Sequence, residues 1–234
     1  MVFSNQMSNS LPVEISIPIT IKIDPMERLL LINFEKDSDN IYIGFEPQVF
    51  NDAINGIGHL IIGWRKDKKI DVCHQKSLHP DPSKYNIAGA GLNEMIMVEM
   101  DKAVFIVNDY GVQAHYQFHD ILNRKVEIKI NEKNSAKRKP FGLLAPMGDA
   151  ATHPEALPLI FLQDFYFVRK DHTELKLSID NRSHIPDLLP MRMDGEKMTF
   201  IRYSPKPLII TLNTAFNGNL KSFELIPGMK YFEK

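Results

Sequence analysis

The sequence predicts an all-β protein: one large antiparallel β-barrel or β-sandwich of about a dozen strands, with very little helix. Three observations predict this class. Apolar and polar residues alternate in most of the apolar runs, which is the period of a half-buried strand. Turn-forming residues separate the runs at short intervals. The 15 prolines fall mainly between the runs rather than inside them.

The first half of the chain contains seven expected strands. The run from Val13 to Ile23, VEISIPITIKI, alternates branched apolar residues over its length. The next runs form expected hairpins, with turns at the DSDN and KDKK segments and at Asp101. These strands are expected at residues 28–36, 40–47, 59–65, 70–77, 94–100 and 103–109.

The second half continues the same pattern, with strands expected at residues 112–120, 125–132, 159–170, 173–181, 197–204 and 207–216. A short helix is expected only at Pro47 to Ile54. Two longer irregular segments, Leu78 to Leu92 and Pro140 to Pro158, have the length typical of a lid or of the mouth of a site. No repeat and no low-complexity linker divides the chain, so a single all-β domain over residues 1–234 is expected.

Composition excludes several classes of function. The net charge of −1 leaves no basic surface for nucleic acid, and the only basic run, Lys137 to Lys139, is short. Cys73 is the sole cysteine, which is typical of a reducing compartment. The amino terminus lacks the pattern of a secretory signal, and no apolar run is long enough for membrane insertion. A soluble, cytoplasmic protein is therefore expected.

The segment HYQFH, His115 to His119, raises the question of a metal site. On a helix the two imidazoles would share a face and could hold one ion, whereas on a strand they lie about 13 Å apart. The segment belongs to a nine-residue alternating run, so a strand is predicted. No other histidine pair has a third ligand at a diagnostic spacing, and neither a metal nor a cofactor is expected.

The same strand provides the first candidate binding residues, Gln113, His115, Gln117 and His119. They share one face, which is polar but uncharged. Amides and imidazoles are typical of a partly buried cavity, where a full charge would be costly. The alternative is a solvated face that lacks charges.

Two further segments contain candidate catalytic residues. Asp164 and Tyr166 lie in LIFLQDFYFVRK, whose faces are both largely apolar, so Asp164 is expected to be buried. A buried carboxylate needs a partner, or its pKa rises and it can carry a proton. The structural alternative is that Asp164 accepts hydrogen bonds from backbone amides of a loop. The loop IDNRSHIPDLLP contains the candidate catalytic residue His184 and the candidate ligand-binding residue Arg182, and it could bind a carboxylate or perform acid–base chemistry. A structural role explains the same residues through turn hydrogen bonds and an Arg–Asp pair.

Three functions follow from these residues. The first is a cytoplasmic protein that binds a small, mostly apolar molecule with a polar end in an internal or cleft pocket. The second is a cofactor-free hydratase, lyase or isomerase in which Asp164 and His184 act as acid and base and Tyr166 orients the substrate. The third is a protein–protein interaction module with an exposed sheet edge. The sequence leaves the oligomeric state open.

Overall fold

The computed structural model describes residues 14–17, 20–24, 26–87, 91–134, 136, 138–146, 158–213 and 221–224. These residues form 18 strands and two short 3-10 helices, and no α-helix occurs among them. The prediction of an all-β fold is confirmed.

The larger sheet contains 11 strands. Their bounds are β2 Thr20–Asp24, β3 Arg28–Asn33, β4 Tyr42–Asp52, β5 Gly56–Arg65, β6 Ile70–His74, β7 Leu92–Met97, β11 Phe141–Pro146, β12 Pro158–Arg169, β15 Leu188–Met193, β16 Glu196–Ser204 and β17 Leu208–Asn213. The hydrogen-bonded order is β2–β17–β12–β16–β3–β4–β5–β6–β7, with β11 added to β12 and β15 added to β16. Neighbours are antiparallel except β6 and β7, which are parallel.

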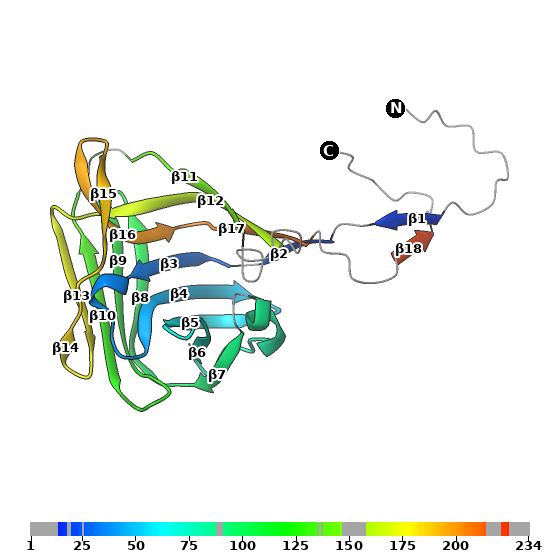
Figure 1. The fold of residues 1–234 in the computed structure, drawn as a ribbon, viewed down its shortest axis with the longest axis horizontal. Coiled ribbons are helices and arrows are strands. Elements are labelled where there is room, and N and C mark those ends of the chain that lie inside the picture. The colour runs from blue at the N-terminus through cyan, green and yellow to red at the C-terminus, as the bar shows by residue number, and fades with distance from the viewer. Residues whose placement is uncertain are drawn as a thin grey trace.

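The smaller sheet contains five antiparallel strands in the order β14–β13–β10–β9–β8. Their bounds are β8 Met100–Asn108, β9 Gly111–His119, β10 Lys125–Glu132, β13 Thr173–Ile179 and β14 Arg182–Ser183. A separate pair, β1 Glu14–Ile17 with β18 Lys221–Glu224, lies apart from both sheets (Figure 1).

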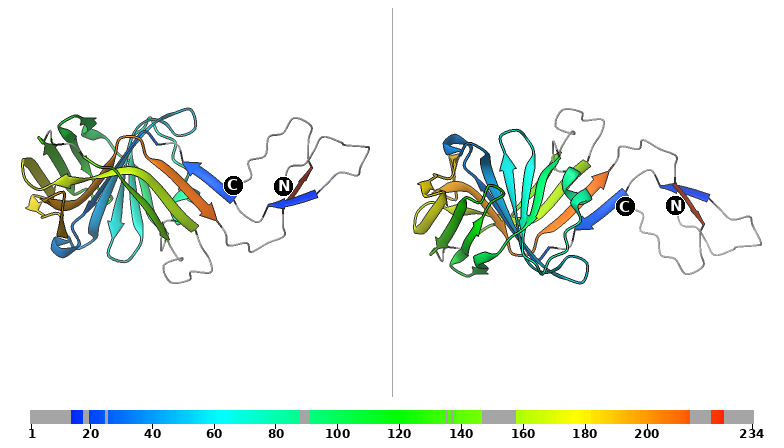
Figure 2. Two further views of the ribbon diagram at one scale, coloured as in Figure 1. Left: turned by 90° about the horizontal axis from the view of Figure 1, so that it is seen from above. Right: turned by 90° about the horizontal axis from the view of Figure 1, so that it is seen from below.

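The two sheets form a sandwich and do not close into a barrel (Figures 1 and 2). Alternate residues of each strand point to the partner sheet, because successive side chains of a strand lie on opposite faces. Leu30 and Tyr203 of the larger sheet thus share one buried cluster with Tyr116 and Ile128 of the smaller sheet. This cluster is the core of the sandwich.

The prediction of a helix from Pro47 to Ile54 is wrong. Strand β4 continues through Pro47 to Asp52, and the 3-10 helices lie elsewhere, at η1 Glu35–Asp37 and η2 Pro82–Ile87. Strand β4 tolerates a proline because the β3–β4 ladder has a gap there: Leu29 pairs with Gln48 and Ile32 with Phe45, with no pair recorded between them. A proline lacks the N–H that a continuous ladder would need.

The expected hairpins are confirmed in part. Strands β5 and β6 pair antiparallel, as do β9 and β10. The expected hairpin of residues 94–109 is wrong, because β7 pairs with β6 in the larger sheet while β8 pairs with β9 in the smaller one. Val98 and Glu99 therefore carry the chain from one sheet to the other.

The two long irregular segments contain some regular structure. Strand β11 occupies the start of the second segment, and η2 lies in the first. Residues 88–90 and 147–157 lie outside the described residues. Their expected role at the mouth of a site stays a prediction.

Candidate ligand-binding face

The larger sheet has apolar side chains on both of its faces. One face packs on the smaller sheet; we call the opposite one the outer face. The sequence anticipates such a sheet in runs such as LLLI and LII, which are apolar at consecutive positions and so place apolar residues on both sides. The register aligns one row of residues across the outer face of five strands. The pairs join Phe167, Arg202 and Leu31 across β12, β16 and β3, and Glu46 and Ile62 across β4 and β5. The β3–β4 pairs on either side of the gap in that ladder place Leu31 level with Glu46.

Glu46 is a carboxylate in a mostly apolar setting. Glu46 is only 7% exposed, and both of its carboxylate oxygens accept hydrogen bonds. Gln48 Nε2 donates to Oε1 at 2.8 Å, and Trp64 Nε1 donates to Oε2 at 3.0 Å. Burial raises the pKa of Glu46, while these hydrogen bonds and the charge of Arg202 act in the opposite direction. The carboxylate is thus held in place by two neighbouring strands.

Arg202 is the cation of the same row. Its Nη2 donates to Asn33 Oδ1 at 2.6 Å, and its guanidinium lies 4.4 Å from the centre of the Phe200 ring. Nε is buried and has no hydrogen-bond partner among the described residues. Burial lowers the pKa of Arg202, and the nearby charge of Glu46 partly offsets this effect. The guanidinium is oriented by an amide and an aromatic ring rather than by a carboxylate.

Four phenylalanines continue the outer face beside Arg202. Phe200 stacks on Phe167 at 6.4 Å between ring centres, and Phe167 lies 5.5 Å from both Phe165 and Phe141. Aromatic pairs at these separations stabilise one another beyond the area that they bury. Phe141, Phe167 and Phe200 stay partly exposed, so this cluster presents aromatic surface next to a cation.

On the other side of Glu46 the outer face is mostly aliphatic. Its side chains form a second buried cluster that is separate from the core of the sandwich. The buried members are Phe50, Leu60, Ile62, Ile70, Val72 and Leu78, with Met26, Trp64, Tyr85, Leu92 and Met95 packed against them. Glu46 and Arg202 therefore lie between a partly exposed aromatic cluster and a buried, mostly aliphatic one.

The polar row predicted to line a cavity does not face the interior. Gln113, His115 and Gln117 are half-buried and His119 is exposed, on the face of β9 that points away from the core. His115 Nε2 lies 3.6 Å from Glu127 Oε1 on the neighbouring strand. The predicted orientation was wrong because the other face of β9, which includes Tyr116 and Phe118, is more apolar and is buried instead. A ligand-binding role of the row stays a prediction.

The predicted catalytic residues lie far apart. Asp164 is exposed rather than buried, at φ 53°, where β12 changes partner from β17 to β16. Tyr166 faces the core and stacks on Tyr203 at 5.5 Å. The loop that carries His184 contacts β16 at Phe200, whose amide donates to that loop. The register then separates Asp164 from this loop by roughly 16 Å along the strand, too far for one acid–base pair.

The loop that contains Arg182 and His184 holds η1 in place. His184 is buried, and its Nδ1 lies 2.7 Å from the carbonyl oxygen of Asp37. Arg182 is exposed and pairs with the Asp37 carboxylate at 3.3 Å. The Asp187 carboxylate accepts from the amides of Glu35 at 2.9 Å and Lys36 at 3.2 Å. These contacts match the structural alternative for this loop.

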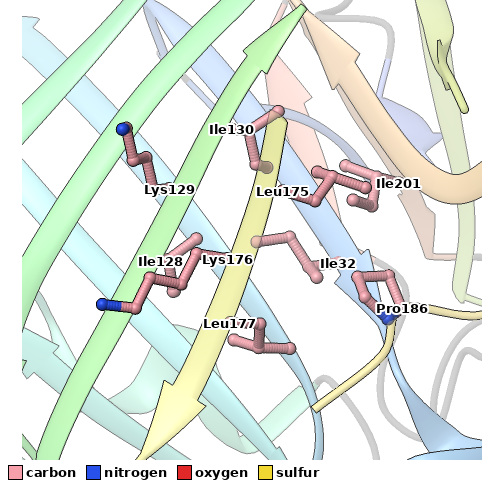
Figure 3. Close-up of a pocket in the computed structure, with 9 residues that line it drawn as sticks. All are labelled: Ile32, Ile128, Lys129, Ile130, Leu175, Lys176, Leu177, Pro186 and Ile201. Carbon is pink, nitrogen blue, oxygen red and sulfur yellow. The ribbon is translucent and has the colours of Figure 1, made fainter. Parts of the chain in front are cut away.

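Side chains of the two sheets pack together in the buried core cluster. Figure 3 shows a small gap where aliphatic residues of β3, β10, β13 and β16 meet, large enough for about one water molecule. The gap is lined by Ile32, Ile128, Lys129, Ile130, Leu175, Lys176, Leu177, Pro186 and Ile201. This gap is too small for a ligand, and the outer face, with its oriented polar groups, is the candidate site that we consider.

The described part of the chain holds no group of three or more potential metal ligands. Within the same ranges, no helix is long and apolar enough to cross a membrane.

Sequence reasoning missed Glu46 and Arg202, although both leave a signal. In GFEPQVF and TFIRYS, a charged residue alternates with aromatic residues inside an apolar strand. Each segment alone is typical of a strand with one solvated face. Only the order of β16, β3 and β4 in the sheet brings the two charges into one row.

Comparisons of the chain with protein-family models, with curated proteins and with solved structures find no match.

Proposed function

We propose that this protein binds a small, mostly apolar molecule with a polar end on the outer face of the larger sheet. The observation that supports the proposal is the presence of two oriented charged residues, Arg202 and Glu46, on a mostly apolar sheet face. Ligand sites combine apolar walls with a few oriented polar groups, and this face provides both. The polar groups of this face are held in place by few contacts: Asn33 orients Arg202, and Trp64 with Gln48 orients Glu46.

The free energy available from apolar contacts favours a ligand that has both an apolar part and a polar end. Burial of about 200 Å² of apolar ligand surface contributes roughly 5 kcal/mol before the cost of association. A dissociation constant of about 1 µM requires about 8 kcal/mol. Polar contacts at one end of the ligand have to supply the difference.

A neutral fluorescent probe, N-phenyl-1-naphthylamine, tests the proposal without involving charge. We expect saturable binding to the wild type, and about tenfold weaker binding to the Leu31→Gln variant, because the polar amide would interrupt the apolar row between Arg202 and Glu46. The matched control is Ile106→Gln. Ile106 is 48% exposed on the smaller sheet, so its replacement should leave probe binding unchanged.

Thermal melting of each variant, followed by circular dichroism, separates loss of binding from loss of fold. If Leu31→Gln lowers stability too far, Phe141→Ser at the rim of the aromatic cluster serves as a second variant. The proposal fails if the wild type does not bind the probe, or if the folded outer-face variants bind it as the wild type does.

A further inference from the structure

We infer that the polar end of the ligand is a carboxylate, bound by the guanidinium of Arg202. The inference rests on the proposed function and deepens it, because it assigns the charge of the ligand and the residue that recognises it. Its basis is a cation on the outer face that no carboxylate of the described residues neutralises by direct contact.

The hydrogen bonds of Arg202 leave most of its donors unused. A guanidinium has five N–H donors in a planar fork. Among the described residues only Nη2 has a bond to a protein acceptor, the neutral amide oxygen of Asn33, and Nε is buried without a partner. A partly buried guanidinium that contacts no carboxylate of the described residues is costly, so an anionic ligand would lower that cost.

Glu46 does not take the place of that counter-ion. It is the carboxylate whose charge acts on Arg202, yet the two form no ion pair in the described structure. Both Glu46 oxygens are engaged, one by Gln48 and the other by Trp64. Turning either oxygen toward Arg202 would leave a buried donor on β4 or β5 unsatisfied.

The surroundings of Arg202 favour a flat anion attached to an apolar chain. Asn33 and the Phe200 ring fix the plane of the guanidinium, and a carboxylate matches that plane with two parallel hydrogen bonds. Phe167 and Phe141 extend the surface away from Glu46. A fatty carboxylate would place its head on Arg202 and its alkyl chain along these rings, where its negative charge stays away from the Glu46 side.

Calorimetric titration with decanoate and with decanol tests this assignment, since the two ligands share the alkyl chain and differ in charge. We expect the wild type to bind decanoate about 10- to 100-fold more tightly than decanol, the range of a charge-assisted contact in a partly buried site. Arg202→Gln should lose this preference but keep its affinity for decanol. Arg202→Lys should restore part of the preference, because it keeps the charge without the fork.

The matched control is Arg192→Gln, since Arg192 is exposed on β15 and donates only to the Gly195 carbonyl among the described residues. Its preference for decanoate should equal that of the wild type. Equal binding of the two ligands to the wild type, or an unchanged preference in folded Arg202→Gln, overturns the carboxylate assignment and leaves the apolar face as the site. If neither ligand binds, the proposed function itself fails.

Discussion

Replacement of Trp64 by phenylalanine should destabilise the protein by about 2–3 kcal/mol. Trp64 Nε1 donates to Glu46 Oε2 at 3.0 Å, and Glu46 is only 7% exposed. A hydrogen bond to a charged group contributes about 1.5–3 kcal/mol, and its loss leaves one carboxylate oxygen buried without a donor. For a chain of this length, 1 kcal/mol corresponds to about 2–4 °C, so the melting temperature should fall by about 4–12 °C.

The assay is guanidinium and thermal unfolding followed by far-ultraviolet circular dichroism, because Trp64 is the only tryptophan and its fluorescence is lost in the variant. Tyr110→Phe is the control: Tyr110 is 58% exposed, and its hydroxyl has no bond recorded in the described structure. It should change stability by less than about 0.5 kcal/mol. A Trp64→Phe effect as small as that of the control would refute a buried Glu46–Trp64 hydrogen bond.

Two further predictions concern buried carboxylates. Burial raises the pKa of Glu46 above its ordinary value of 4.5, so the folded state holds this proton more tightly than the unfolded state and loses stability as the pH rises from 4.5 toward the folded pKa. The difference in melting temperature between Glu46→Gln and the wild type should therefore grow in favour of the variant as the pH rises over that range. The variant itself should still lose some stability with rising pH, because burial also raises the pKa of Glu132. A constant offset between the two proteins at all pH values contradicts the burial of an ionisable Glu46. Asp187→Ala should cost about 3 kcal/mol in urea unfolding, because the Asp187 carboxylate accepts from the first two amides of η1. An effect below about 0.5 kcal/mol, the level expected for the exposed control Asp101→Ala, would show that this loop does not hold η1.

The alternation of residues predicts where the strands lie but not which of their faces is buried. In β9 both faces contain large residues that could line an interior, and the more apolar face with Tyr116 and Phe118 is the one that packs in the core. The amides and imidazoles of β9 lie on its other, less buried face and point away from the core. The same alternation located the strands of the outer face, in which Phe165 and Phe167 share one side of β12.

Local sequence patterns do not predict which distant segments of the chain pair with one another. The crossing at Val98 and Glu99 depends on which sheet offers a free edge, and two adjacent apolar runs look like a hairpin in either case. Arg202 and Glu46 come into one row only through the strand order of β16, β3 and β4. The gap in the β3–β4 ladder that accommodates Pro47 is a property of the two paired strands, so the sequence of β4 alone does not reveal it.

Quenching of Trp64 by a brominated ligand tests the outer-face site most directly. Bromine quenches tryptophan at short range, and Trp64 lies on this face beside Glu46. Titration with a brominated dodecanol should reduce Trp64 fluorescence in a saturable manner, and unbrominated dodecanol should compete for the same site without quenching. Binding that calorimetry detects but that leaves Trp64 unquenched would place the ligand elsewhere and contradict the account.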